Sequence, residues 1–449
     1  MNRAVSPDLT FESLLRMFRD HGVTRLLMKP LAPNDNSKNQ IYLGGDLSVL
    51  NVIPSQKVVT ATSSSRKPGE SGRKILKARL LWSWLDAEGV AHPAPDVQLI
   101  LYPQYPEVRL SGFLRGCDIE LGQWLDPRRD GRLEGRTLLM GVGPDAQVFA
   151  HLVLPGSVID RQLAEITPLT RYEALSELPF VGRDDTARLL AELRRIHKLG
   201  WITGKRLGTD HQLLPCNNQN CGGYTLEAEL GISPNGLAEP DFLGWEVKSF
   251  TVRDFRKLQS AIITLMTPEP DGGLYKDDGP EAFVRKFGYP DVGGQRDRLN
   301  FGGVHTFGNS HPKTGLRIIL TGYDSDDQKI LDVNGGLALV SRDQCAASWS
   351  FRKLINHWKR KHDKAAYLPN TAEVGPPRRY QYADSVQLGR STQFERFLAA
   401  IITGKLYYDP GIKLEGASEQ SPKIKRRNQF RIRARDLSSL YDSFERSSL

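Results

Sequence analysis

The sequence contains little cysteine and no long apolar segment, and both absences exclude classes of protein. Only four cysteines occur among 449 residues, and only Cys216 and Cys221 lie close together. No second Cys or His pair stands at zinc-site spacing, so we expect reduced thiols rather than a structural metal or a disulfide framework. No apolar segment approaches the roughly 20 residues that span a membrane, and the first residues lack a secretory signal. We therefore expect a cytoplasmic protein with no membrane partner.

Most of the chain has no excess of Lys and Arg over Asp and Glu, and the positive charge is concentrated near the C-terminus. The formal net charge is +9, and residues 351–435 hold 19 Lys and Arg against 7 Asp and Glu. The basic stretches "HWKRKHDK" and "SPKIKRRNQFRIRAR" lie here, with aromatic and amide side chains between the charges. One such cluster can be a solvated surface, but an asymmetry of this size favours a polyanionic partner.

The pattern of apolar residues changes near residues 170–185, and no internal repeat is present. Before this point, a helix over 10–22 is followed by short strand-like segments at 41–53, 77–89, 97–114 and 146–154. After it, amphipathic helices are predicted over 184–200 and 392–404, around strand-like segments at 242–250, 316–323 and 335–340. Ala187, Leu190, Leu193 and Ile196 recur at helical spacing in the first helix, and Thr392-x-x-Glu395 gives the second a capping box. We predict a mainly-β domain over 1–175 and a mixed α/β domain over 176–449.

One strand-like segment, "EPDFLGWEVKSF" (239–250), carries three ionisable side chains among apolar ones. Such groups are costly to bury unless they pair or bind a metal. Because residues two apart point the same way in a strand, Glu246 and Lys248 share a face, and Trp245 and Val247 point into a core. Pro240 favours an extended approach that lets Asp241 turn back toward Glu246. Two carboxylates and an ammonium suit Mg²⁺ and a polarised water, and the alternative is a structural ion pair.

These residues resemble a known class of enzyme. "EPDFLGWEVKS" is similar to the core of PD-(D/E)xK nucleases, and most similar to the MvaI/BcnI restriction endonucleases, whose fold is related to that of the MutH mismatch-repair nickase. Further similar segments run in order from about residue 185 to the C-terminus: "GWITGKRLGT", "YTLEAELGI", "ITLMTPEP", "WSFRKLINHWKRKH", "GKLYYDPGIK" and "RNQFRIRARDL". The resemblance implies that Asp241 and Glu246 bind Mg²⁺, that Lys248 serves the attacking water, and that Glu227 supports the metal or the water.

The last two of these segments resemble those that face DNA bases in the family. Asp409 and Arg431 are the best base-reading candidates, because Arg can bridge guanine O6 and N7 and Asp can accept from the cytosine amino group. The candidates for phosphate or base contacts are Lys413, Lys425, Arg426, Arg427, Gln429 and Arg433. On a separate predicted loop, we expect His305 and His311 to be solvated or to face DNA, not to bind a metal.

The N-terminal region has a looser resemblance of its own. Residues 26–55 are similar to the start of the EcoRII effector domain, a β-pseudobarrel like the plant B-three domain. The candidate DNA contacts in this segment are Lys29, Asn34, Asn36 and Lys38, and the alternative is a polar surface loop. An effector-like domain before an MvaI-like nuclease is the layout of a type IIE enzyme.

Taken together, the sequence predicts a type II restriction endonuclease that cuts double-stranded DNA at a short, C/G-rich, pseudosymmetric site. The resemblance implies a monomer that cuts each strand in turn, a second effector DNA at the N-terminal domain, and a cognate DNA methyltransferase in the same system. One alternative is a MutH-like nickase or a modification-dependent nuclease. Another is a non-cleaving DNA-binding protein, against which the intact Asp241, Glu246 and Lys248 argue.

Overall fold

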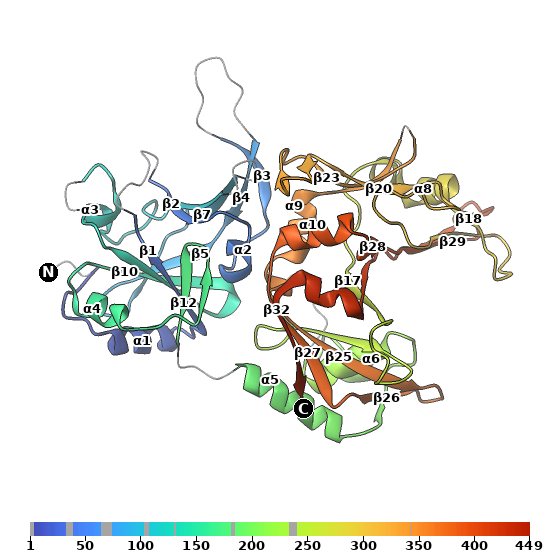
Figure 1. Cartoon of the computed structure of the whole chain (residues 1–449), viewed down its shortest axis with the longest axis horizontal. Coiled ribbons are helices and arrows are strands. Elements are labelled where there is room, and N and C mark those ends of the chain that lie inside the picture. The colour runs from blue at the N-terminus through green and yellow to red at the C-terminus, as the bar shows by residue number, and fades with distance from the viewer. Residues whose placement is uncertain are drawn as a thin grey trace, which may run out of the picture. The chain divides into compact units, whose positions relative to one another are not determined.

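The computed structural model describes residues 4–32, 39–63, 74–102, 107–129, 132–180, 185–232, 240–342 and 344–449. The chain divides into two compact units, Met1–Arg183 and Asp184–Leu449 (Figure 1). The boundary predicted between 175 and 176 falls inside β12 (Leu175–Leu178), which belongs to the first unit. No helix in the described ranges has the length and apolar character needed to cross a membrane.

The first unit begins with the predicted helix, α1 (Phe11–Asp20). The Thr10 side chain accepts a hydrogen bond from the Ser13 backbone N–H and caps the first turn, as a threonine at this position should. Gly22 follows with φ 71°, a left-handed conformation in which glycine has no steric cost. The buried face of α1, with Leu14 and Phe18 fully enclosed, packs into the core of the unit.

Two sheets make this unit mainly β, as predicted. The seven-stranded sheet has the order β11 (Thr170–Tyr172), β12, β1 (Arg25–Pro30), β9 (Thr137–Val142), β10 (Gln147–Val153), β5 (Leu81–Leu85) and β6 (Ala91–Pro93). The five-stranded sheet has the order β2 (Ile41–Gly44), β8 (Glu107–Ser111), β7 (Gln98–Tyr102), β4 (Lys74–Arg79) and β3 (Val59–Thr62). The other helical segments in the described part of this unit are α2 (Val49–Val52), α3 (Gly122–Leu125), η1 (Pro144–Ala146) and α4 (Val158–Ala164). The segment 41–53 is therefore a strand followed by a helix, not strand throughout, and pseudobarrel closure stays a prediction.

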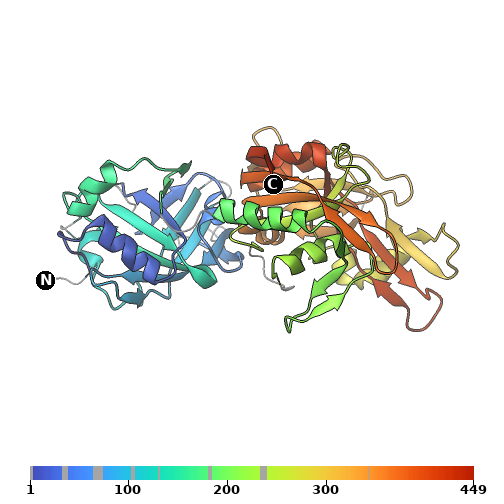
Figure 2. The ribbon, with the colours of Figure 1, turned by 90° about the horizontal axis from the view of Figure 1, so that it is seen from below.

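The second unit is the predicted mixed α/β domain, built on a six-stranded sheet. The main path of this sheet is β13 (Ile202–Thr203), β26 (Arg379–Tyr382), β25 (Lys364–Glu373), β27 (Ser385–Thr392) and β32 (Tyr441–Ser448). The sixth strand, β16 (Glu246–Thr251), pairs in parallel with β25 and carries the charged motif. The helices α5 (Asp185–Lys198) and α6 (Cys221–Glu229) add apolar side chains to the core on this sheet, and Figure 2 shows α5 in green along it.

The second unit also contains smaller sheets. Three-stranded sheets are formed by β17 (Ile262–Met266), β31 (Phe430–Arg433) and β28 (Leu406–Tyr408), and by β20 (Arg317–Thr321), β23 (Gly336–Val340) and β24 (Cys345–Ser350). A four-stranded sheet has the order β18 (Tyr289–Pro290), β19 (Arg298–Gly302), β29 (Gly411–Glu415) and β30 (Lys423–Lys425). The hairpins are β14 (Lys205–Leu207) with β15 (Leu213–Pro215), and β21 (Tyr323–Asp324) with β22 (Lys329–Ile330). The remaining helical segments are α7 (Leu274–Asp277), α8 (Gly279–Phe287), α9 (Phe351–Trp358), η2 (Arg360–His362), α10 (Phe394–Ile402) and η3 (Ala434–Leu440).

Both long helices predicted for this unit are present, with two local corrections. In α5 the buried residues are Leu189, Leu193 and Ile196, whereas Ala187 is exposed, so the apolar face is turned from the predicted one. In α10 the capping box is wrong, because Thr392 ends β27 and its hydroxyl donates to the Leu440 carbonyl at 2.6 Å. Because the Thr392 hydroxyl is bonded to this carbonyl, it does not cap α10.

Candidate active site and DNA-facing surface

A tight turn brings Asp241 back beside β16. Phe242 and Trp245 exchange two backbone hydrogen bonds of 2.9 and 2.8 Å, and the two residues between them, Leu243 and Gly244, have φ of 50° and 78°. Positive φ at both central residues defines the turn that best fits the twist of a hairpin. The Val247 backbone N–H then donates to Asp241 Oδ2 at 3.3 Å. This turn brings Asp241 back toward β16, and the contribution predicted for Pro240 stays a prediction.

Apolar neighbours anchor the strand as predicted. Trp245 and Val247 are buried in the core cluster with residues of α5 and β26. On β25, Ala365 lies opposite Glu246 and Tyr367 lies opposite Lys248, so parallel pairing fixes the register of the charged face. A slip of one residue would send both charged side chains into the core.

Two lysines surround the buried Glu246 carboxylate. Lys248 Nζ donates to Glu246 Oε1 at 2.8 Å. Lys361 Nζ, from η2, lies 3.3 Å from Glu246 Oε2 and 3.5 Å from Asp241 Oδ1. Lys361 was not among the predicted site residues, because in the sequence the segment 357–364 shows only a basic cluster. Its only signal was position within the segment "WSFRKLINHWKRKH" that resembles the family.

Glu227 projects from α6 toward the same carboxylates. Burial, followed by the charges of Asp241 and Glu246, raises the pKa of Glu227 to about 7. Burial and the Glu246 charge likewise raise the pKa of Asp241 to about 6. Burial alone would raise the pKa of Glu246, but Lys248, Asp241 and Lys361 together lower it. The three carboxyl groups therefore share one site in which the ionised forms of Glu227 and Asp241 are disfavoured, whereas the ionised form of Glu246 is stabilised.

The residues fit a divalent cation held by two carboxylates. Within the described ranges, no group of three or more His, Cys, Asp or Glu side chains is placed to hold a metal ion. Mg²⁺, however, is commonly held by one or two carboxylates and keeps several waters. Glu246 Oε2 is buried without a hydrogen-bond partner, since Lys361 approaches it only as an ion pair. A buried oxygen of this kind, with Asp241 beside it, is suited to a cation.

The two base-reading candidates, Asp409 and Arg431, form an ion pair at the three-stranded sheet β17–β31–β28. Arg431 Nη1 lies 2.6 Å from Asp409 Oδ2, and Arg431 Nε donates to Thr264 Oγ1 at 3.2 Å. Gln429 accepts a hydrogen bond on its backbone carbonyl from the Asp409 N–H at 2.8 Å. Arg433 follows on the same face of β31 and is exposed. The tertiary structure thus brings together polar side chains that lie more than twenty residues apart.

The other candidates are more scattered. Arg427 is exposed, and its side-chain carbons lie over Gly411, while Lys413 is exposed on β29. Lys29 lies on β1 in the first unit, where its Nζ donates to the Pro30 carbonyl at 2.7 Å. Asn34, Asn36 and Lys38 fall outside the described residues.

The expectation of solvated or DNA-facing histidines is wrong for His305. Its ring is fully buried, with Nδ1 2.9 Å from the Gly303 carbonyl and Nε2 2.9 Å from Thr314 Oγ1. Burial and the neighbouring His311 lower its pKa to about 4, so the ring is neutral at pH 7. The reason is a backbone pairing of His305 with Tyr408, which draws the loop against β28.

The expectation of reduced thiols is also corrected. Cys216 and Cys221 form a disulfide, with their Cα atoms 5.7 Å apart. The connecting turn is held to the main sheet, because Tyr380 Oη donates to the Asn218 carbonyl and Tyr382 Oη to the Gly222 carbonyl. Spacing in the sequence could not show that these contacts bring the two cysteines within bridging distance.

An Asp-x₄-Glu-x-Lys motif on a paired strand, faced by a further glutamate from a helix, is the active-site layout of PD-(D/E)xK nucleases. The model of the MvaI/BcnI restriction endonuclease family matches residues 190–441. The chain therefore belongs to the MvaI/BcnI restriction endonuclease family, and its enzymatic class is that of the type II site-specific deoxyribonucleases.

Two solved structures are similar to the chain. The MvaI complex with cognate DNA has 16% identity and a TM-score of 0.43, and the match covers 60% of this chain and 99% of that one. MvaI without DNA has 15% identity and a TM-score of 0.32, with 59% and 98% covered. No curated protein matched this chain.

Proposed function

We propose that this enzyme hydrolyses phosphodiesters of double-stranded DNA with Mg²⁺ held by Asp241 and Glu246. The observation that carries the proposal is the convergence of Asp241 with the buried Glu246, whose Oε2 has an ion pair with Lys361 at 3.3 Å but no hydrogen-bond partner in the described part of the chain. The raised pKa values of Asp241 and Glu227 add to it, because crowded carboxylates are relieved by a cation. Bound Mg²⁺ would supply Lewis-acid polarisation of the scissile phosphate and neutralise the charge that develops on it.

The surrounding side chains have separate roles in this proposal. Lys248, held by Glu246 at 2.8 Å, orients the attacking water on the face of β16 that carries both side chains. Lys361 compensates the negative charge that Asp241 and Glu246 share. Glu227, with a pKa of about 7, can accept or release a proton near neutral pH. In-line attack by the water leaves 5′-phosphate and 3′-hydroxyl ends.

Recognition of the target is assigned to the sheet that contains β28 and β31. The Arg431 guanidinium can bridge guanine O6 and N7, and the Asp409 carboxylate can accept from a cytosine amino group. In the free protein these two side chains are paired with each other at 2.6 Å, so the pair must open or pivot to reach bases. Because Arg suits guanine and Asp suits cytosine, we propose a short, C/G-rich, pseudosymmetric site that a monomer cuts one strand at a time.

Digestion of unmodified plasmid with and without Mg²⁺, followed by sequencing of the ends, tests the proposal. Discrete cuts are expected only with Mg²⁺, and Lys248→Ala should abolish them. Lys198→Ala is the matched control, because Lys198 is an exposed lysine in the last turn of α5, outside the site. Lys198→Ala should cut as the wild type does.

Other outcomes would replace the proposal with a different one. Nicks confined to one strand would identify a MutH-like nickase, and cuts only in methylated plasmid a modification-dependent nuclease. Binding without any strand breaks would identify a non-cleaving DNA-binding protein. The restriction activity further implies a DNA methyltransferase that protects the host's own sites.

For the first unit we propose the binding of a second copy of the target as an effector. Its mainly-β build and the position of Lys29 on β1 support a DNA-binding role. A short duplex that contains the mapped site, added in trans, should then accelerate cleavage of a plasmid with a single site. A rate that the added duplex does not raise would contradict the effector role.

A further inference from the structure

The four-stranded sheet β18–β19–β29–β30 has one apolar and one polar face. Register places Leu299, Leu414 and Ile424 side by side on adjacent strands, and Leu414 is fully buried. The same face carries Phe301 and Ile412, both fully buried. Helix α8 packs against β19 and β29, with its own Phe283 and Val284 buried. Helix α8 does not cover the opposite face, which carries the residues that alternate with the apolar ones along each strand.

The polar face carries a row of side chains that runs across all four strands. Register pairs Tyr289 with Asn300, Asn300 with Lys413, and Lys413 with Lys425. The cross-strand neighbours of Lys413 are thus an amide and a second lysine, with no carboxylate directly opposite. Like charges directly opposite in a sheet are destabilising, and the ion pair of Lys425 with Glu415 at 3.0 Å offsets this repulsion. Both lysines are exposed.

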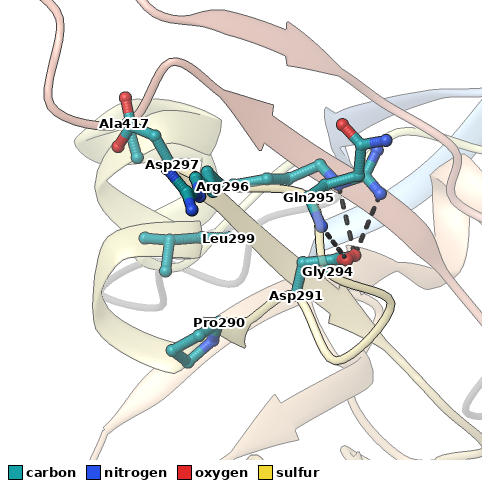
Figure 3. A pocket seen from close by; sticks show the side chains of 9 residues that line it. Pro290, Asp291, Gly294, Gln295, Arg296, Asp297, Leu299 and Ala417 are labelled. Carbon is teal, nitrogen blue, oxygen red and sulfur yellow. Dashed lines mark hydrogen bonds and ion pairs between the residues drawn. The ribbon is translucent and has the colours of Figure 1, made fainter.

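Neighbouring residues increase the positive charge of this face. Lys313 Nζ lies 4.8 Å from the centre of the Tyr289 ring, and Lys423 is exposed in the next row. The carboxylates nearby are already engaged. Asp291 accepts from Arg298 and Asn300 and, in the turn shown in Figure 3, from the Gln295 backbone N–H at 3.1 Å. Glu415 is paired with Lys425, a member of the row, at 3.0 Å and with Arg298 at 3.6 Å, so two cations share this one carboxylate.

This face is continuous with the proposed base-reading residues. Asp409 lies two residues before Gly411, which pairs with Gly302 across β29 and β19, and Tyr289 Oη lies 3.5 Å from the position that a Cβ on Gly302 would take. The cross-strand pair Gly302 and Gly411 therefore lies between the row and Asp409, with side-chain carbons of Arg427 over Gly411. With strands about 4.8 Å apart, the row from Tyr289 to Lys425 spans about 14 Å, the axial rise of about four phosphates on one DNA strand.

We propose that the lysine row, defined as Lys413 and Lys425 with Lys313 and Lys423 beside them, binds the sugar–phosphate backbone of the DNA that flanks the target site. Charge complementarity selects a duplex polyanion as the occupant. The contacts are independent of sequence, so the row holds any duplex while Asp409 and Arg431 read bases. This inference rests on the proposed function and assigns Lys413 and Lys425 to phosphates rather than bases.

The test is the salt dependence of binding by the full chain, with Ca²⁺ in place of Mg²⁺ to prevent cleavage. The probes are labelled duplexes of about 30 base pairs, one containing the site at which the wild type cuts plasmid and one of scrambled sequence. The double variant Lys413→Ala, Lys425→Ala should bind both probes about 50-fold more weakly near 0.1 M salt, and the slope of log K against log salt should fall by about 2. Lys286→Ala, at an exposed lysine of α8 across the sheet, should leave both quantities unchanged.

Two results would overturn the inference. One is an unchanged slope in a double variant that melts as the wild type does. The other is a loss confined to the cut-site probe, which would make these lysines base readers. Failure of the proposed function has a different signature, because a wild type that cuts no plasmid would still bind the scrambled probe. In that case a slope that falls in the double variant upholds the phosphate-binding row on its own.

Discussion

Replacing Glu227 by glutamine should stabilise the free enzyme while impairing cleavage. Glu227 shares a buried site with Asp241 and Glu246, and its pKa is raised from an ordinary 4.5 to about 7. A carboxyl whose pKa is higher in the folded than in the unfolded state binds more protons when folded. Stability therefore falls as pH rises from about 4.5 to about 7 and stays at the lower level above that range. Glutamine has no such charge and removes this loss.

The pKa difference sets the size of the effect. A change of one pKa unit corresponds to about 1.4 kcal/mol, so the charged Glu227 costs about 3 kcal/mol at pH 8. Part of this cost is shared with Asp241, whose own pKa rises through the same repulsion, and about 2–3 kcal/mol is the expected gain in the variant. In a unit of this size the gain corresponds to an increase of about 5–10 °C in the melting temperature. At pH 4.5 the two proteins should melt together.

Thermal unfolding of both proteins without metal, from pH 4.5 to 8, measures this difference. Glu229→Gln is the matched control on the same helix, because Glu229 is paired with Lys205 at 2.6 Å and with Arg195 at 3.4 Å. It should gain no stability at any pH. A Glu227→Gln variant no more stable than the wild type at pH 8, or one whose gain is the same at every pH, would refute the assignment of Glu227 to the carboxylate cluster.

Three further predictions address other parts of the second unit. Lys361→Met should lower the cleavage rate about 10–100-fold, since Asp241 and Glu246 lose a compensating charge; an unchanged rate in single-turnover assays would remove Lys361 from the site. Arg431→Lys should relax discrimination at one base pair of the target by about 1–3 kcal/mol, measured as relative cleavage of single-base variants, because lysine cannot bridge guanine bidentately. Gly244→Ala should lower the free energy of unfolding by about 1 kcal/mol in chemical denaturation, because φ is 78° at this position. No atom lies within 4 Å of an added Cβ at Gly244 or at Gly223 in helix α6. Gly223→Ala should therefore raise the free energy of unfolding by about 0.5–1 kcal/mol. Equal effects at the two glycines would show that the turn at Gly244 is not strained.

The sequence by itself determined the features that depend on neighbours along the chain. Alternation in "GWEVKSF" assigned Trp245 and Val247 to the core and Glu246 and Lys248 to the opposite face, since a strand reverses its side chains at every residue. Helical spacing likewise located α1 and α10. The ordered set of short motifs indicated the family, and the family model matches residues 190–441.

Only the tertiary structure decided which distant residues share a site. Lys361 contacts Asp241 across 120 positions of sequence, and nothing local distinguishes it from the other basic residues of its segment. The burial of His305, the Cys216–Cys221 disulfide and the Asp409–Arg431 ion pair have the same origin. Local sequence specifies the direction of a side chain within its own strand or helix. Its partners depend on how strands and helices pack, which follows from the burial of apolar surface over the whole unit.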